Sequence, residues 1–248
     1  MSSGIGLEFM EKTQFKHLRE TDQGKGFPRP PLELDFDGTK SIISLPHPKH
    51  IDIGRIDLVE AIVNRRSVRK YSEEPLTLEE LSFLLWCTQG VKEILGLPAT
   101  LRTVPSAGAR HALETHLLVN RIKGMQPGLY RFLAVNHKLV EISLDPSLAD
   151  RITEACLDQR FVKTSAVTFI WVAVRYRMVW RYGERGYRYL HIDVGHVCQN
   201  LYLAAEAISG GVCAIGAFDD EAINESLGVD GKQQFAIYVA TVGKKQMT

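Results

Sequence analysis

Several features that place a protein in a special class are missing from this chain of 248 residues. No stretch approaches 18 uninterrupted apolar residues, so the sequence predicts no membrane span. The first 20 residues contain no uninterrupted apolar segment of the kind that signal peptides carry. Thirty lysines and arginines against 29 acidic residues leave a net charge of +1, which favours neither nucleic acid nor an anionic membrane as the main partner. We therefore expect a cytoplasmic globular protein whose electrostatic functions are local.

Cysteines are few, far apart and surrounded by apolar neighbours. This distribution predicts buried free thiols in a reducing compartment and disfavours a disulfide framework. A metal site at His191, His196 and Cys198 is not favoured, because residues five apart lie on different faces of a helix. We expect no bound metal. The cysteines are Cys87, Cys156, Cys198 and Cys213.

Other catalytic signatures are missing too. The small-residue stretch Gly210–Asp220 does not follow the G-x-G-x-x-G pattern, and it follows a helix and not a strand, so it is not a dinucleotide fingerprint. Ser106 and His111 lack the strand–turn–helix context of a hydrolase nucleophile. We find no internal repeat.

Composition divides the chain into an arm and a body. Residues 1–55 are rich in Pro, Gly and charge and show little periodicity. We interpret them as an extended arm that wraps over a body, its own or a partner's; a disordered tail is the alternative. The alternating residues 40–45 favour some order. Residues 56–248 form the body, which at 45% hydrophobic residues overall can bury a full core.

Hydrophobic periodicity in the body predicts interspersed helices and strands without a βαβ rhythm, which is typical of an α+β fold. Capping signals at Asp57 and Thr77, each followed by Glu three residues later, start two helices. The run 166–174 is nearly continuously apolar and predicts a central strand. Further helices are expected at 145–157, 187–209 and 219–228, and further strands at 112–122, 128–135, 137–144 and 234–243.

The longest expected helix, 187–209, is apolar over much of its surface. One seam steps by three and four residues, and a second flank lies beside it, so we expect a helix that is buried centrally or in a dimer interface. The seam consists of Leu190, Val194, Val197, Leu201, Ala204 and Ile208, and the flank of Ile192, Cys198, Tyr202 and Ala205.

Positive charge is concentrated at one short turn. Arginine forks, a serine hydroxyl and the spare N–H groups of nearby helix ends make a suitable phosphate cradle, although a solvated basic turn explains the same residues. The turn contains Arg65, Arg66, Ser67, Arg69 and Lys70.

Three other stretches each have more than one interpretation. Val104–Glu114 and Gly210–Asp220 are rich in small residues that let a flat ligand approach the backbone, or they are ordinary turns. The third, Arg175–Tyr189, interleaves arginines with aromatic residues. It fits a lid over a ligand or a subunit contact, and a nucleic-acid platform less well, since no RNA-binding signature accompanies it.

Taken in order, these stretches resemble the FMN-dependent nitroreductase family and, within it, the SagB-like branch of thiazole- and oxazole-forming dehydrogenases. The resemblance covers about residues 57–245. It implies a nitroreductase-like fold, with a mixed, mostly antiparallel sheet flanked by helices and a long central helix. It also implies a homodimer that binds two FMN molecules at the subunit interface. The matching stretches are 65–90, 104–119, 128–132, 180–207 and 210–245.

The resemblance assigns cofactor-binding roles to particular residues. The arginine–serine motif holds the FMN phosphate, ribityl chain and pyrimidine edge, a Pro-Ser loop reaches the flavin from the other subunit, and a small-residue segment lies along the ring. Polar and basic residues further along the chain add contacts. In this order the residues are Arg65, Arg66, Ser67 and Arg69; Pro105, Ser106, Ala107, Gly108, Ala109 and Arg110; Ala214, Ile215 and Gly216; and Gln159, Lys244 and Lys245.

One departure from the branch concerns catalysis. Azoline oxidases place a catalytic Lys-Tyr pair before the long helix, where this chain has Arg181 and Tyr182. Arginine stays protonated, so it does not replace lysine as a base, whereas Tyr182 keeps a proton to donate. These two residues are the candidate catalytic pair.

The resemblance favours an oxidoreductase that passes hydride from NAD(P)H through FMN to a small electron-poor acceptor of the nitro or quinone type. The first alternative is an azoline-type dehydrogenase that oxidises a peptide-derived heterocycle. The second is a flavin- or nucleic-acid-binding module without turnover.

Overall fold

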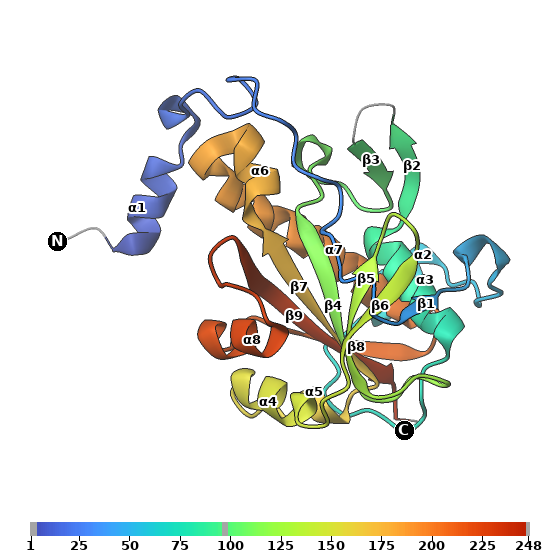
Figure 1. The fold of residues 1–248 in the computed structure, drawn as a ribbon. Coiled ribbons are helices and arrows are strands. Elements are labelled where there is room, and N and C mark those ends of the chain that lie inside the picture. The colour runs from blue at the N-terminus through green and yellow to red at the C-terminus, as the bar shows by residue number, and fades with distance from the viewer. Residues whose placement is uncertain (1–3, 96–98, 247–248) are drawn as a thin grey trace.

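A computed structural model describes residues 4–95 and 99–246 of the chain, traced by colour in Figure 1. The helices are α1 (Ile5–Lys12), α2 (Leu58–Asn64), α3 (Leu78–Gln89), α4 (Leu148–Ala155), α5 (Phe161–Thr164), α6 (Arg175–Tyr182), α7 (Gly186–Glu206) and α8 (Asp220–Leu227). The strands are β1 (Ile42–Ser44), β2 (Val91–Leu95), β3 (Ala99–Arg102), β4 (Leu113–Val119), β5 (Gly128–Leu133), β6 (Lys138–Ser143), β7 (Val167–Val174), β8 (Gly210–Ile215) and β9 (Gln234–Lys244). Short 3-10 turns are η1 (Phe15–His17), η2 (Pro48–His50), η3 (Ala107–Ala109) and η4 (Gly183–Arg185).

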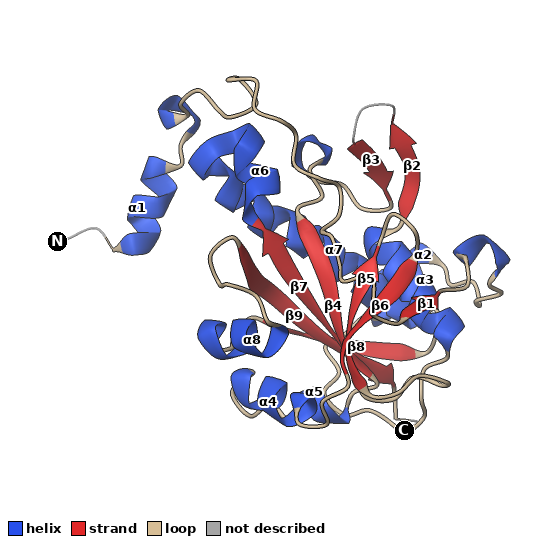
Figure 2. Ribbon diagram, viewed as in Figure 1, coloured by secondary structure: helices blue, strands red, loops and turns tan. Residues whose placement is uncertain are grey.

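The expected α+β fold is confirmed, with a twisted sheet at its centre (Figure 2). Among the described residues this sheet has seven strands in the order β1-β6-β5-β4-β7-β9-β8. Every pairing between them is antiparallel. The expected parallel component is reduced to isolated bridges such as Ser67 with Val212. Strands β2 and β3 form a separate hairpin, which the sequence analysis missed.

Strand β7 is central, as predicted, and both of its faces are buried. Trp171 packs into the core that contains Leu84 of α3, while Ile170 packs into a second core with Ile223 of α8. A strand covered on both faces carries apolar residues on both, which explains the lack of alternation in β7, where Thr168 is the one buried hydroxyl residue. Helices α3 and α7 therefore cover one face of the sheet, and α4, α5 and α8 cover the other (Figure 1).

The predicted seam of the long helix is buried, and α7 itself ends at Glu206, before the last seam residue Ile208. On the second flank Ile192 is 53% exposed in the single chain. Cys198, Tyr202 and Ala205 of that flank are buried. The buried seam residues are Leu190, Val194, Val197, Leu201, Ala204 and Ile208.

The two helix starts behave differently. Thr77 and Glu80 form the full capping box before α3, because each side chain accepts the other's backbone N–H. Asp57 caps α2 by accepting the N–H groups of Val59 and Glu60. In α2 Ala61 is buried, whereas Leu58 and Ile62 are exposed.

The arm runs over its own body, from α1 past α6 and down to β1 (Figure 1). It is not wholly extended, because residues 5–12 form α1. Its backbone carbonyls are held by side chains of the body. The indole of Trp180 donates to Phe27 O at 3.0 Å, and Arg177 Nε donates to Pro31 O at 2.9 Å. Among the described residues, none of the helices is both long enough and apolar enough to span a membrane.

Candidate functional site

The basic turn lies directly against the edge strand β8. Val68 donates its N–H to Val212 O at 2.9 Å, and Ser67 forms a bridge with Val212. A β-carbon on Gly211 would lie 2.7 Å from Val68, so the close approach of the two segments requires glycine there. The turn therefore continues the sheet and is not a loose solvated loop.

Tyr202 of α7 connects the turn to the small-residue segment that ends β8. Its hydroxyl lies 3.0 Å from Ser67 Oγ and accepts the N–H of Ala214 at 2.9 Å. The guanidinium of Arg65 lies 5.2 Å from the centre of the Tyr202 ring. Two of the stretches that the sequence selected as cofactor-binding are thus joined through one side chain. Together we call Arg65–Arg69, Tyr202 and residues 214–216 the turn site.

Sequence reasoning missed Tyr202 because it counted the residue only as part of the apolar flank. A signal was available, since a tyrosine is the one residue of that flank with a hydroxyl that needs a partner when buried. Helix propensity and periodicity carry no information about that partner.

Charge at the turn site is not compensated. Among the described residues, no carboxylate forms an ion pair with Arg65, Arg66 or Arg69. Arg69 lies against the thiol of Cys213, whose pKa is raised by burial and drawn back by this arginine. Gly216 is exposed, with open space where a side chain would be. Three guanidinium groups beside an open backbone are a donor set that fits a phosphorylated planar ligand.

The remaining predicted contacts divide into two groups. Gln159 lies next to the segment 214–216, because its amide donates to Ala217 O at 3.1 Å. Lys244 instead pairs with Glu80 at 2.5 Å and also donates to Ile208 O. Lys245 pairs with Glu206 at 2.6 Å. Both lysines therefore use their charge within the fold, with Lys244 tying β9 to the start of α3.

The Pro-Ser loop is fixed by a buried carboxylate of α7. Asp193, 4% exposed, accepts the hydroxyl of Ser106 at 2.6 Å and the N–H of Ala107 at 3.1 Å. Burial raises the pKa of Asp193, and the bond from Ser106 opposes that shift. Ser106 Oγ in turn accepts the N–H of His111 at 2.9 Å. This network holds the loop in a fixed shape on top of α7.

The candidate catalytic pair lies against the same loop. Gly108 has a φ of +57°, and a β-carbon there would lie 2.4 Å from the Tyr182 hydroxyl and 2.9 Å from Arg181 Nε. Arg110 donates to Gly108 O at 3.1 Å and stacks over Trp180 with 5.3 Å to the ring centre. We call residues 105–110 with Arg181, Tyr182 and Asp193 the loop site.

The turn site and the loop site lie at different levels of α7. Tyr202 and Asp193 are nine residues apart, which corresponds to roughly 14 Å along a helix at 1.5 Å per residue. The two sites of one chain are therefore separate surfaces, although the sequence resemblance joins them around one flavin.

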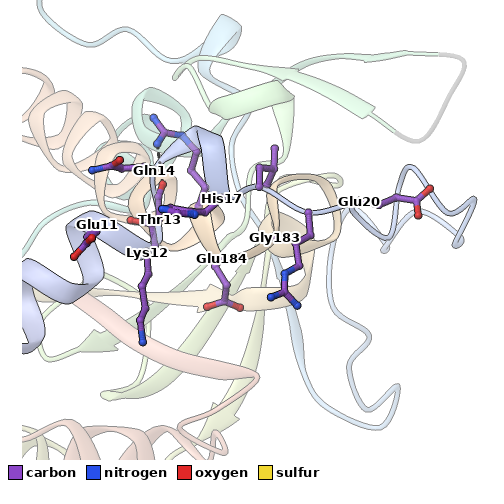
Figure 3. A pocket seen from close by; sticks show the side chains of 11 residues that line it. Glu11, Lys12, Thr13, Gln14, His17, Glu20, Gly183 and Glu184 are labelled. Atoms are coloured by element: carbon purple, nitrogen blue, oxygen red, sulfur yellow. Dashed lines mark hydrogen bonds between the residues drawn. The ribbon is translucent and has the colours of Figure 1, made fainter.

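A cavity of about 780 Å³ lies beside the loop site, between the arm and η4 (Figure 3). Residues 11–14, 17–20 and Gly183–Arg185 line it, and Gly183 directly follows Tyr182 in the chain. Its lining mixes both signs of charge. None of the predicted cofactor-binding residues is among the described residues that line it.

Comparison with known proteins identifies relatives of this chain. The model of the nitroreductase family matches residues 62–244. A candidate nitroreductase of Methanocaldococcus jannaschii is 38% identical over 195 residues, covering 78% of this chain and 94% of that protein. The trifolitoxin-processing protein TfxB of Rhizobium leguminosarum is 30% identical over 141 residues, covering 54% of this chain but 38% of its own length.

Solved structures share the fold. A candidate nitroreductase of Anabaena variabilis superposes with a TM-score of 0.70 at 28% identity, covering 84% of this chain and 42% of that one. A candidate nitroreductase of Desulfovibrio desulfuricans in complex with FMN superposes with a TM-score of 0.54 at 18% identity, covering 78% and 88%. At that identity the likeness concerns the fold alone.

The protein belongs to the nitroreductase family and is an oxidoreductase by class. The family resemblance drawn from the sequence is confirmed, and the likeness to the trifolitoxin-processing protein agrees with the branch named there.

Proposed function

We propose that the protein is an FMN-dependent oxidoreductase that takes hydride from NAD(P)H and passes it to a small electron-poor acceptor. The observation that carries this proposal is the turn site, where Tyr202 joins Ser67 to Ala214 beside arginines that no described carboxylate neutralises. The phosphate of a planar cofactor pairs with the arginines of this site, and its ring lies against residues 214–216. An FMN complex with the same fold supports the choice.

Each part of the turn site has a role in holding the cofactor. Arg65, Arg66 and Ser67 bind the phosphate and the ribityl chain, because guanidinium forks match phosphate oxygens. Ala214, Ile215 and Gly216 present small side chains and backbone to the ring. Arg69 stabilises negative charge at the pyrimidine edge. The lysines Lys244 and Lys245, which the sequence proposed as phosphate ligands, fix β9 through Glu80 and Glu206.

FMN supplies two-electron hydride chemistry when bound, and the protein supplies orientation and electrostatics. With a nitro or quinone acceptor no dedicated base is needed. Tyr182 lies beside the exposed loop residue Gly108 and has a hydroxyl that can donate a proton to a reduced acceptor.

The loop site completes the flavin site of a second copy. Pro105, Ser106, Ala107 and the residues that follow form a rigid projection, held by Asp193, about 14 Å along α7 from the turn site of the same chain. Exposed apolar side chains on α2 and α7 support a homodimer, since such surfaces mark protein interfaces. They are Leu58, Val59, Ile62, Val63 and Ile192.

The likeness to a trifolitoxin-processing protein favours a second candidate, an azoline-type dehydrogenase that oxidises a peptide-derived heterocycle. Arg181 weakens this candidate, because a guanidinium does not accept a proton from an azoline carbon. A binding module without turnover is the remaining alternative. In each case we place the protein in the cytoplasm.

Mixing two inactive variants tests the composite site. One variant carries Arg65→Gln, Arg66→Gln and Arg69→Gln, and the other carries Gly108→Val. Heterodimers that form after unfolding and refolding the mixture contain one intact site, so we expect roughly a quarter of wild-type NAD(P)H oxidation to return. No recovery, with both variants folded and dimeric by light scattering, would show that each site is built from one chain.

A further inference from the structure

A second cationic cluster surrounds the loop site, separate from the turn site. Arg110 stacks on one side of the Trp180 indole, and Arg29 of the arm lies 5.7 Å from the centre of the same ring. Arg181 stacks on Tyr182 at 5.6 Å and reaches the space beside Gly108. Three elements far apart in the sequence thus bring guanidinium groups to one loop.

Two arginines of this cluster lack an acidic counterpart in the described residues. No carboxylate pairs with Arg110 or Arg181 there. The pKa of Arg110 is lowered to about 10 by burial and then by the like charges of Arg29 and Arg181. Arg110 is still protonated at neutral pH, so the fold holds repelling cations together at this place.

The nearby carboxylate does not neutralise them. Asp193 uses both oxygens on Ser106 and Ala107 and is buried beneath the loop. Gly108, whose missing side chain leaves room for Arg181 and Tyr182, is exposed. Arg110 is itself buried and donates to two carbonyls of the loop. An anion therefore approaches the two arginines from the side of Arg181 and Gly108, away from Asp193.

We propose that Arg110 and Arg181, with Arg29 beside them, form an anion subsite that binds the carboxylate or phosphate group of a substrate next to Tyr182. Guanidinium forks bind both groups through paired charge-assisted hydrogen bonds. The subsite gives Arg181 a purpose that suits its permanent charge, namely binding and not proton abstraction. It rests on the proposed function, because it names the class of substrate that the same site reduces.

A direct measurement of substrate binding tests this inference independently of catalytic turnover. The flavin-loaded protein is titrated by calorimetry with 4-nitrobenzoate and with neutral 4-nitrobenzamide. We expect the wild type to bind the carboxylate at least tenfold more tightly. In Arg181→Gln and Arg110→Gln that ratio falls below threefold, whereas Arg175→Gln, the same charge change on α6, keeps it. Because no turnover is needed, the result stands even if NAD(P)H proves to be the wrong reductant.

A parallel titration with NADPH and NADH identifies the source of the anion. A preference for NADPH that disappears in Arg181→Gln, with equal binding of the two nitro compounds, assigns the subsite to the 2′-phosphate of the nucleotide. Equal binding of the two nitro compounds by the wild type, together with equal binding of NADPH and NADH, overturns the proposal. So does a preference that survives both arginine substitutions, because the anion is then bound elsewhere.

Discussion

The hydroxyl of Tyr202 lies 3.0 Å from Ser67 Oγ, so a residue of the central helix and a residue of the basic turn share a hydrogen bond across 135 positions of sequence. The same hydroxyl accepts the Ala214 N–H. One side chain therefore fixes the spacing between the arginines and the segment proposed to lie along the flavin.

Tyr202→Phe is expected to weaken FMN binding about tenfold. The substitution keeps the ring under Arg65 but leaves Ser67 and the Ala214 N–H without their common partner, at a cost of roughly 1–1.5 kcal/mol. Quenching of flavin fluorescence measures the Kd. Tyr187→Phe removes a hydroxyl from the same helix and is the matched control. An unchanged Kd in Tyr202→Phe contradicts the role given to this residue.

Arg66→Gln is expected to separate FMN from riboflavin. A charge-assisted hydrogen bond to phosphate is worth roughly 1.5–3 kcal/mol, so FMN affinity drops about ten- to hundredfold while riboflavin, which lacks the phosphate, binds as before. Lys70→Gln, an exposed neighbour with the same charge change, serves as control. Equal losses for both flavins would mean that Arg66 does not contact the phosphate.

Gly108→Ala tests the contact between the loop and the catalytic pair. Placing alanine at a positive φ costs about 1–2 kcal/mol of stability. Gly124→Ala is the control, because Gly124 has a φ of +80° and open space around it, so that its alanine variant has this cost without a clash. We expect both alanine variants to lose similar stability. Only Gly108→Ala displaces Tyr182 and Arg181, and its kcat falls at least tenfold more than that of Gly124→Ala. Matched kcat values would rule out the loop as part of the active site.

The buried pair of Arg177 and Glu114 is expected to anchor the arm. The two groups lie 2.7 Å apart, and their side chains are 3% and 4% exposed. Arg177→Met removes the ion-pair partner of a buried carboxylate, for which the N–H of Leu34 then remains the one hydrogen-bond donor among the described residues. The substitution should cost about 3–5 kcal/mol in urea unfolding. Arg151→Gln breaks an exposed pair with Asp145 and should cost less than about 1 kcal/mol. Similar costs for the two variants contradict this account.

Acid is expected to destabilise the fold through buried histidines. Burial is the first cause that lowers the pKa values of His111 and His116 to about 3 and of His137 to about 4, from 6.5. Below pH 6.5 the unfolded chain takes up these protons and the folded chain does not. The free energy of unfolding therefore falls as pH drops from 6.5 towards 4. At pH 5 the loss is about 2 kcal/mol for each histidine. His116→Phe should remove about one third of this loss in denaturant titrations at pH 7 and pH 5, and an unchanged loss would contradict the assignment.

The sequence was informative where one strong local signal decided the outcome. The apolar run at 166–174 predicted a central strand, and Thr77 with Glu80 predicted a helix start; both are confirmed as β7 and α3. The order of motifs identified the family although each motif was weak.

Tertiary contacts decided the rest. Residues 210–215 form the edge strand β8 because β9 and the basic turn pair with them, a fact that small-residue composition hides. The partners of Lys244 and Lys245 were equally invisible, since Glu80 and Glu206 are distant in sequence. Periodicity placed Tyr202 on the apolar flank of the helix, whereas its hydroxyl bonds to Ser67 and Ala214 make it part of the turn site.

The most direct test of the central claim is the absorption spectrum of the purified protein, recorded before and after anaerobic addition of NADPH or NADH. The account predicts bound FMN whose absorption bleaches with a reduced nicotinamide and returns when a quinone or nitro compound is added. Bound flavin that neither nucleotide bleaches would contradict hydride transfer from NAD(P)H and favour the dehydrogenase. A colourless protein that FMN cannot reconstitute would contradict the cofactor itself.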